Sequence, residues 1–188
     1  MAAYYYLASS LPMLVDPMQD PPVSSQDFLE QCRMFMTPKD YENILGTSIN
    51  PGENHSHNLG ENFGKWESSL RNELVRLRAQ VQGLNPDDFL REDSFISGTA
   101  EIASAAMQKS TPLEAELYLT QKRWDCVDEL SAGHFFDIQF LQGYRLKLQL
   151  LERRAKFVEE NGFDAYRSIY ARVLEASGSE IPVGGNNG

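Results

Sequence analysis

The sequence predicts an all-α protein, a single helical bundle of about six to seven helices with two long amphipathic helices. In one stretch, from Trp66 to Leu84, apolar residues recur every three or four positions, the spacing that places side chains on one helical face. A second stretch, from Phe136 to Val158, has the same spacing. The third observation is a series of helix start signals separated by short turns. The two apolar faces comprise Trp66, Leu70, Leu74, Leu77, Val81 and Leu84, and Leu141, Tyr144, Leu148, Leu151, Ala155 and Val158.

Helix boundaries in the first part of the chain follow from capping residues. Three tyrosines open the segment from Tyr4 to Leu7, which we expect to form a short helix or an extended arm packed on the bundle. Ser24 with Asp27 three residues later is typical of a helix start, because a short side-chain oxygen accepts from a first-turn amide. Thr37, followed by proline, predicts a second start. Gly46 predicts its end.

The first long helix is expected after a glycine-rich connection. Residues 47–64 contain three glycines and predict a flexible loop. We expect the long helix to begin at about Glu61 or Trp66 and to end at Gly83. On its surface, Glu67 with Arg71 and Glu73 with Arg76 are spaced to form a solvent-exposed ladder of ion pairs.

The second half continues with helices. An Asn-Pro-Asp-Asp sequence at residues 85–88 caps a short element, and Ser97–Met107 predicts a helix whose small residues allow close approach. Thr111, Pro112 and Glu114 form a start signal in which the glutamate can reach back to the cap amide. The buried side of that helix is expected to comprise Leu113, Leu117, Trp124 and Val127.

The longest helix is expected after residues 131–133 and to about Glu160, a length of roughly 40 Å at the usual rise per residue. Gly143 within it indicates close packing or a slight bend. A last helix is predicted over Phe163–Ala176. We therefore expect a helical domain over residues 1–176 and a flexible tail over residues 177–188, which is rich in Gly and Asn.

Composition limits the classes of function. The 188 residues are 41% apolar, enough for a real core, and carry a formal charge of −10, which argues against nucleic acid or an anionic membrane as partner. Cys32 and Cys126 lie outside metal and redox spacings and indicate reduced core thiols of a cytosolic protein. No stretch approaches the roughly 20 apolar residues of a membrane span, so we expect no direct membrane insertion.

The sequence contains no catalytic signature, and we predict no catalytic, cofactor-binding or metal-binding residue. His55 and His57 beside Glu53 have a metal-like composition, but they fall in the predicted loop without a further strong ligand. Phosphate-binding and dinucleotide-binding loops and a glycine-flanked nucleophilic serine are missing. Because catalytic groups assemble in space, a small-ligand enzyme or regulator stays open as an alternative. It would need a deep polar pocket with residues such as His134, Tyr144 and Arg145.

Contact with a protein partner is the other class of function. Three tyrosines near the amino terminus, the arginines of the first long helix and a basic run between Arg145 and Lys156 are the candidate surfaces, although core packing and a solvated helix face are the simpler interpretations. The candidate partner-binding residues are Tyr4, Tyr5, Arg71, Arg78, Arg145, Lys147, Arg153 and Arg154.

Four segments carry a family resemblance: YYYLASSLPML from Tyr4, PPVSSQDFLEQC from Pro21, KWESSLRNELVRLRA from Lys65, and FDIQFLQGYRLKLQLLERR from Phe136. In combination they resemble an uncharacterised bacterial family encoded with the subunits of V/A-type ATPases (V-type ATP synthases). More distantly, the leucine-rich helix that ends at Arg153 is similar to helices of the V/A-ATPase component called C or d, the helical cup that joins the rotor stalk to the membrane ring.

The resemblance implies a non-catalytic peripheral subunit or assembly factor of a rotary ATPase that transports ions. Such a protein would be cytoplasmic and peripheral to the inner membrane, held there by contacts with other ATPase subunits in the stalk or the membrane ring. ATP hydrolysis would belong to those other subunits, and this chain would need no cofactor.

Overall fold

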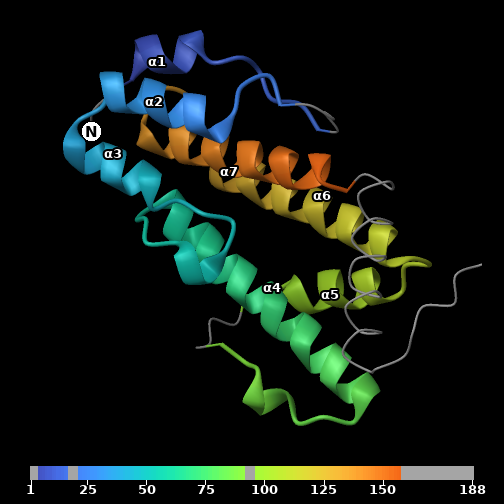
Figure 1. Cartoon of the computed structure of the whole chain (residues 1–188). Helices are drawn as coiled ribbons and strands as arrows, with labels where there is room; N and C mark the ends of the chain where they lie inside the picture. The colour runs from blue at the N-terminus through green and yellow to red at the C-terminus, as the bar shows by residue number, and fades with distance from the viewer. Residues whose placement is uncertain (1–3, 17–20, 92–95, 158–188) are drawn as a thin grey trace, which may run out of the picture. The chain divides into compact units, whose positions relative to one another are not determined.

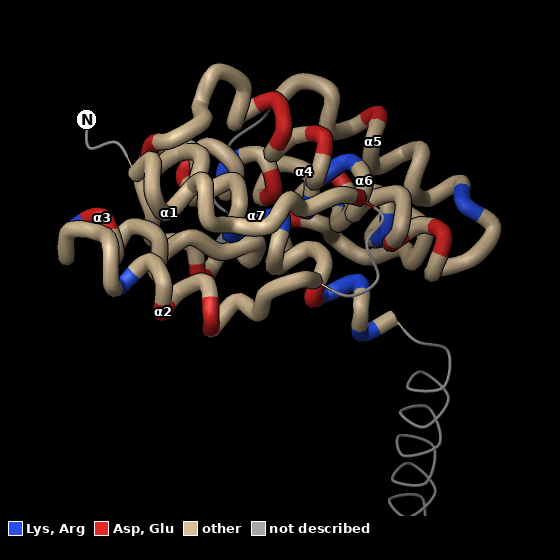
Figure 2. The backbone as a smooth tube through the Cα atoms, turned by 90° about the horizontal axis from the view of Figure 1, so that it is seen from above, with Lys and Arg blue, Asp and Glu red and all other residues tan. Residues whose placement is uncertain are grey.

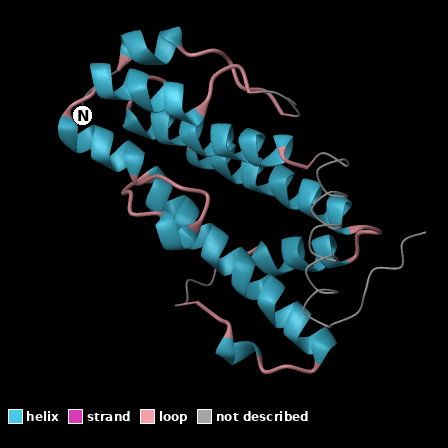
Figure 3. Ribbon diagram, in the orientation of Figure 1, coloured by secondary structure: helices cyan, strands magenta, loops and turns pink. Residues whose placement is uncertain are grey.

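The structure is a computed structural model that describes residues 4–16, 21–91 and 96–157. The chain divides into two units, Met1–Arg154 and Ala155–Gly188, and the first is described below. The predicted all-α class is confirmed, since the described residues form helices and contain no strand (Figures 1 and 3). The α-helices are α1 Tyr5–Ser10, α2 Ser25–Phe35, α3 Pro38–Leu45, α4 Leu59–Gln82, α5 Thr99–Met107, α6 Pro112–Leu130 and α7 Ile138–Ala155. Two short 3₁₀ helices are η1 Pro51–Glu53 and η2 Pro86–Asp88.

Capping side chains fix the starts of three helices as predicted. The hydroxyls of Ser24, Thr37 and Thr111 each accept a hydrogen bond from the amide three residues later, at 3.1, 3.3 and 3.1 Å. The Glu114 carboxylate reaches back, but it accepts from the amide of Ser110, one residue before the predicted cap amide. These bonds satisfy first-turn amides that the helix itself leaves unpaired.

Three connected clusters of buried side chains form the core. The first joins α1, α2 and α3 to α7, the second joins α4 and α6 to α7, and the third joins α4, α5 and α6. Helix α7 therefore lies between the amino-terminal helices and the α4–α6 pair (Figure 1).

Helix α7 is buried around most of its circumference, not on one face alone. Beside the predicted Leu141, Tyr144, Leu148 and Leu151, it buries several residues that the three-four pattern omits. These are Ile138, Gln142, Gly143, Arg145, Leu146 and Leu150. The pattern missed them because α7 has neighbours on two sides, whereas an amphipathic helix has neighbours on one.

Helix α4, with 24 residues, is longer than α7, with 18, contrary to the predicted order. It begins at Leu59, before the predicted start, because Leu59 and Phe63 are buried against Ile49 and α6. Helix α7 ends at Ala155, short of the predicted Glu160. The end of α4 at Gly83 is confirmed, with a positive φ of 68° that suits glycine.

The predicted apolar side of α4 is buried only along its middle. Leu70 and Leu74 pack against Ala103 and Ala106 of α5, which confirms the small-residue contact. Val81 is 78% exposed and Leu84 is 51% exposed, because the nine-residue α5 does not extend along the whole of α4. Leu113, predicted as buried, is 51% exposed in the first turn of α6.

The connection between α3 and α4 is held by α7 side chains, contrary to the predicted flexibility. The Arg145 Nε donates to the Thr47 carbonyl at 2.7 Å, and the side-chain amide of Gln142 donates to the His57 carbonyl at 2.8 Å. The Ile49 amide donates to the Gln149 side chain at 2.9 Å. Polar side chains of α7 thus hold in place the connection between α3 and α4, which is distant from α7 in the sequence.

Close packing at Gly143 is confirmed. A β-carbon at this position would lie 2.3 Å from the Ser131 hydroxyl oxygen, so a larger residue requires a shift. Val158, the predicted helix Phe163–Ala176 and the predicted tail at residues 177–188 lie outside the described residues.

Candidate protein contact surface

Four exposed aromatic residues, Tyr5, Tyr6, Phe35 and Phe136, form what we call the aromatic surface. Their exposed fractions are 63%, 72%, 47% and 42%. The Tyr5 ring lies 4.9 Å from the Phe136 ring, and the Tyr6 ring lies 5.2 Å from the Phe35 ring, measured between centroids. Since Tyr5 and Tyr6 are consecutive, the two pairs are neighbours on the protein surface.

The fixed position of α1 directs these tyrosines outward. Tyr4 is buried, its hydroxyl donates to the Asp40 carboxylate of α3, and its amide donates to the Phe136 carbonyl. Leu7, three residues after Tyr4, lies on the same helical face and is buried too. Tyr5 and Tyr6 follow Tyr4 on the opposite side. Burial, with the hydrogen bond to Asp40, raises the pKa of Tyr4, so its phenol stays neutral and serves as an anchor.

The aromatic surface has the composition of a protein interface. Tyrosine and phenylalanine are enriched at interfaces because their rings offer large apolar area at a small cost in side-chain entropy. Apolar groups gathered on a surface mark contact sites more often than apolar groups scattered singly. Of the predicted contact residues, Tyr5 belongs to this surface, whereas Tyr4 packs in the core. Tyr6, Phe35 and Phe136 were not among the predicted residues.

Sequence reasoning predicted only Tyr5 of this surface. Phe35 lies seven residues after the buried Phe28, a spacing that places both on one face of α2 and predicts burial, yet Phe35 is 47% exposed. Phe136 follows Gly133 and precedes α7, where no helical pattern constrains it. Their pairing with the α1 tyrosines depends on how three separate segments pack, and no local signal gives that.

Arg71 belongs to a buried ion-pair network and not to a solvent-exposed ladder. The Glu67 side chain has no exposed surface and accepts from Arg71 at 2.7 Å and from both Nε and a terminal nitrogen of Arg123, at 2.9 and 3.0 Å. Arg123 also pairs with Glu116, which in turn pairs with Arg153 at 2.6 Å. The predicted pairing of Glu67 with Arg71 is confirmed, but its predicted exposure to solvent is wrong, because α6 covers this side of α4.

The positive charge of Arg123 is stabilised by the carboxylates of the same network. Burial alone would lower the pKa of Arg123, but the carboxylates of Glu67 and Glu116 outweigh it and raise that pKa. The network therefore contributes to cohesion among α4, α6 and α7, and two of the predicted contact residues, Arg71 and Arg153, are partners in it.

Arg145 is 9% exposed, and its Nε and one terminal nitrogen donate within the chain, whereas the other terminal nitrogen is buried without a partner among the described residues. It donates to the carbonyls of Thr47 and Leu45, at the end of α3, where a cation complements the negative end of the helix. Burial lowers the pKa of its guanidinium. The expectation that Arg145 opens an exposed basic run is wrong because α7 is central and its middle turns face other helices.

Other predicted basic residues lie nearer the surface. Lys147 pairs with Asp128, and Arg154 pairs with Asp16 at 2.9 Å. Arg78 is exposed on α4. Basic and acidic positions are interspersed along the helices (Figure 2), so the charge asymmetry expected from the run of residues 145–156 is reduced by pairing.

His55 and His57 are exposed and line a polar pocket of about 530 Å³ with Lys39, Asp40 and Glu42. Within residues 4–16, 21–91 and 96–157, no three His, Cys, Asp or Glu side chains are grouped so as to hold a metal ion. Cys32 and Cys126 are buried and unpaired, and burial raises the pKa of both thiols to about 12, so they stay protonated at neutral pH.

The three residues that the alternative function would place in one ligand pocket, His134, Tyr144 and Arg145, each bond to a different part of the chain. His134 pairs with Asp137 at 2.6 Å, and the Tyr144 hydroxyl donates to the Pro12 carbonyl at 3.0 Å. Arg145 contacts the end of α3, as described above. The polar atoms of these three side chains thus bond to three different parts of the chain.

None of the helices in the described part of the chain has the length and apolar character needed to cross a bilayer. No family model, curated protein or solved structure matches this chain.

Proposed function

We propose that this protein acts by contact with other proteins and that the aromatic surface is the principal contact. The observation that carries the proposal is the pairing of two exposed α1 tyrosines with two exposed phenylalanines from α2 and the segment before α7. Removing such rings from water favours association, and aromatic side chains often dominate the free energy of binding.

The partner class in this proposal comes from the resemblance of the four sequence segments. The protein would be a non-catalytic peripheral subunit or assembly factor of a V/A-type rotary ATPase, cytoplasmic, and held at the inner membrane by other subunits. The segment from Tyr4, which carries part of the resemblance, also contains two of the four residues of the aromatic surface. A helical body with a fixed aromatic contact suits a coupling or assembly role.

Affinity purification from native membranes tests the proposal. Tagged full-length protein should retrieve subunits of the ATPase stalk or membrane ring from a mild detergent extract. Tyr5→Ser combined with Tyr6→Ser should reduce recovery about tenfold or more, as expected for interface anchors.

Phe89→Ser is the matched control, because Phe89 is 57% exposed and follows η2, away from the aromatic surface. It should leave recovery unchanged, and circular dichroism should show intact helices in all variants. Retrieval of no ATPase subunit by the unaltered protein contradicts the assignment of the partner. Equal retrieval by the Tyr5, Tyr6 double variant contradicts the assignment of the surface.

A further inference from the structure

The carboxy-terminal end of helix α4 carries apolar side chains that are open to a partner. Leu77 is half-buried, Val81 is 78% exposed, and Leu84, just after the helix ends, is 51% exposed. With steps of four and three residues, they continue the face on which Leu70 and Leu74 pack against α5. Figure 1 shows that α4 extends beyond α5 at this end. We call Leu77, Val81 and Leu84 the α4 stripe.

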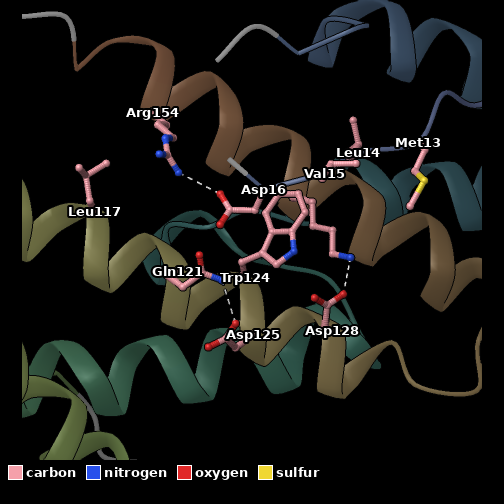
Figure 4. A pocket seen from close by; sticks show the side chains of 11 residues that line it. Met13, Leu14, Val15, Asp16, Leu117, Gln121, Trp124, Asp125, Asp128 and Arg154 are labelled. Carbon is pink, nitrogen blue, oxygen red and sulfur yellow. Dashed lines mark hydrogen bonds and ion pairs between the residues drawn. The ribbon is translucent and has the colours of Figure 1, made fainter. Parts of the chain in front are cut away.

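Charged side chains elsewhere on the surface are largely paired within the chain, and the groove of about 660 Å³ around Trp124 is an example (Figure 4). Arg154 pairs there with Asp16 at 2.9 Å, and Lys147 pairs with Asp128. The Lys147 ammonium also lies 4.9 Å from the centroid of the Trp124 ring, a cation–π distance. Each of these charges therefore already has a partner of opposite sign.

The charges beside the α4 stripe have no such partners. Arg78 follows the first residue of the stripe, and Asp87 and Asp88 of η2 follow its last residue. All three side chains are exposed, and none of them forms an ion pair with a residue in the described ranges. Because η2 packs against α4, the two carboxylates stay beside the end of the helix. The stripe therefore has an unpaired cation near one end and unpaired anions near the other.

We infer that two copies of this chain associate through the α4 stripe, with their α4 helices antiparallel across a two-fold axis. An antiparallel arrangement places the beginning of each stripe beside the end of the other. Arg78 of one copy then lies beside Asp87 and Asp88 of the second copy, and the same pairing recurs on the other side of the axis. A second copy supplies both charges in the required order, which makes the surface self-complementary.

The charge of α4 permits this contact although the chain as a whole is acidic. A formal charge of −10 makes two copies repel each other in general. Helix α4 differs, since its four basic and three acidic residues give 4 − 3 = +1. The stripe spans only about 10 Å of helix at the usual rise per residue. Because interfaces below about 1,200 Å² in total are typical of weak complexes, we expect a reversible dimer.

Sedimentation equilibrium of the full-length protein over a wide range of concentration measures the dimer. We expect the average mass to rise with concentration from one chain toward two. Val81→Glu should weaken the dimer about tenfold or more, because it places a charge in the apolar contact. The monomer should tolerate it, since the side chain is 78% exposed and glutamate favours helices. Met34→Glu, at a 71% exposed position of α2, is the matched control and should leave the dimer unchanged.

A charge exchange tests the antiparallel arrangement. Arg78→Glu alone, and Asp87→Lys with Asp88→Lys, should each weaken the dimer about tenfold or more, because like charges then face each other. The three substitutions together should restore most of the affinity, since opposite charges meet again.

A single-chain mass at every concentration, or equal dimer affinity for Val81→Glu and the unaltered protein, would overturn the inference. A combined variant as weak as the two charge variants would contradict the antiparallel pairing. Loss of the dimer in the Tyr5, Tyr6 double variant would assign it to the aromatic surface instead. The measurement uses the purified chain alone, so its outcome is independent of the proposed ATPase partner.

Discussion

Glu67 has no exposed side-chain surface, although its spacing from Arg71 is typical of a surface ion pair. The pair exists, and its environment differs from the expectation because Arg123 arrives from α6 and closes the site. An i, i+4 spacing defines which side chains meet along a helix, but it does not say whether water or another helix lies outside them.

Glu67→Gln should destabilise the fold by about 3–5 kcal/mol, because it leaves the buried Arg123 guanidinium with less compensating charge. Urea unfolding monitored by circular dichroism measures this loss. Glu61→Gln is the matched control on the same helix, since its pair with Lys65 is exposed. The control should have little effect. Similar midpoints for the two variants would contradict the role assigned to the buried network.

Gly143 and Ser131 should show coupled effects on stability. Gly143→Ala places a methyl group against the Ser131 hydroxyl, which is buried without a hydrogen-bond partner. Ser131→Ala removes that oxygen and leaves a 3.5 Å contact between carbons. The alanine at 143 should therefore be better tolerated with Ser131→Ala than without it, by about 1 kcal/mol in a double-mutant cycle of unfolding free energies. Additive effects would contradict the close approach.

At the scale of the element, helix starts were the most predictable feature. Ser24, Thr37 and Thr111 each act on an amide three residues away, so the residues that decide the boundary are adjacent in sequence. The start of α4 was missed because Asn58 makes no side-chain cap bond, and burial of Leu59 determines the boundary instead.

Asp137 precedes α7, accepts from the Phe140 amide at 3.0 Å and pairs with His134. Burial alone would raise the pKa of Asp137, but these hydrogen bonds outweigh it and lower that pKa below its ordinary value of 3.8. A lowered pKa in the folded state means that the carboxylate stabilises the protein above pH 3.8 and loses this effect as the pH falls further.

Asp137→Ala should therefore cost about 1 kcal/mol at neutral pH, the usual contribution of a helix cap, and less as the pH falls below 3.8. Urea midpoints over a pH series measure the difference. Asp88→Ala, at an exposed position of η2, is the control and should show no such dependence. A difference for Asp137→Ala that grows on acidification would contradict the capping role.

At the scale of the whole molecule, α7 organises the chain on both of its sides. Its apolar residues divide between two core clusters, and its polar residues bind the connection between α3 and α4. A segment with the composition of a flexible loop is thereby ordered by a helix roughly a hundred residues later in the sequence.

Hydrogen exchange should detect this order. The amide of Ile49, bound to Gln149, and the amide of His55, bound to the Gly46 carbonyl, should both be protected. Gln149→Ala should increase exchange at Ile49 while leaving His55 protected, because the His55 bond is local. Exchange is followed residue by residue by NMR. Fast exchange at both amides in the unaltered protein would show that α7 does not hold the connection.

The sequence by itself determined the all-α class, the capped starts of α2, α3 and α6, and the end of α4, because these depend on residues within one or two turns of each other. It also predicted Tyr5 as a candidate contact residue, and the structure leaves Tyr5 exposed. Tertiary structure alone decided that Glu67 and Arg145 are buried, that Val81 and Leu84 are exposed, and that four aromatic residues meet on one surface. Exposure depends on which distant helix covers a side chain, and that packing is a property of the assembled fold.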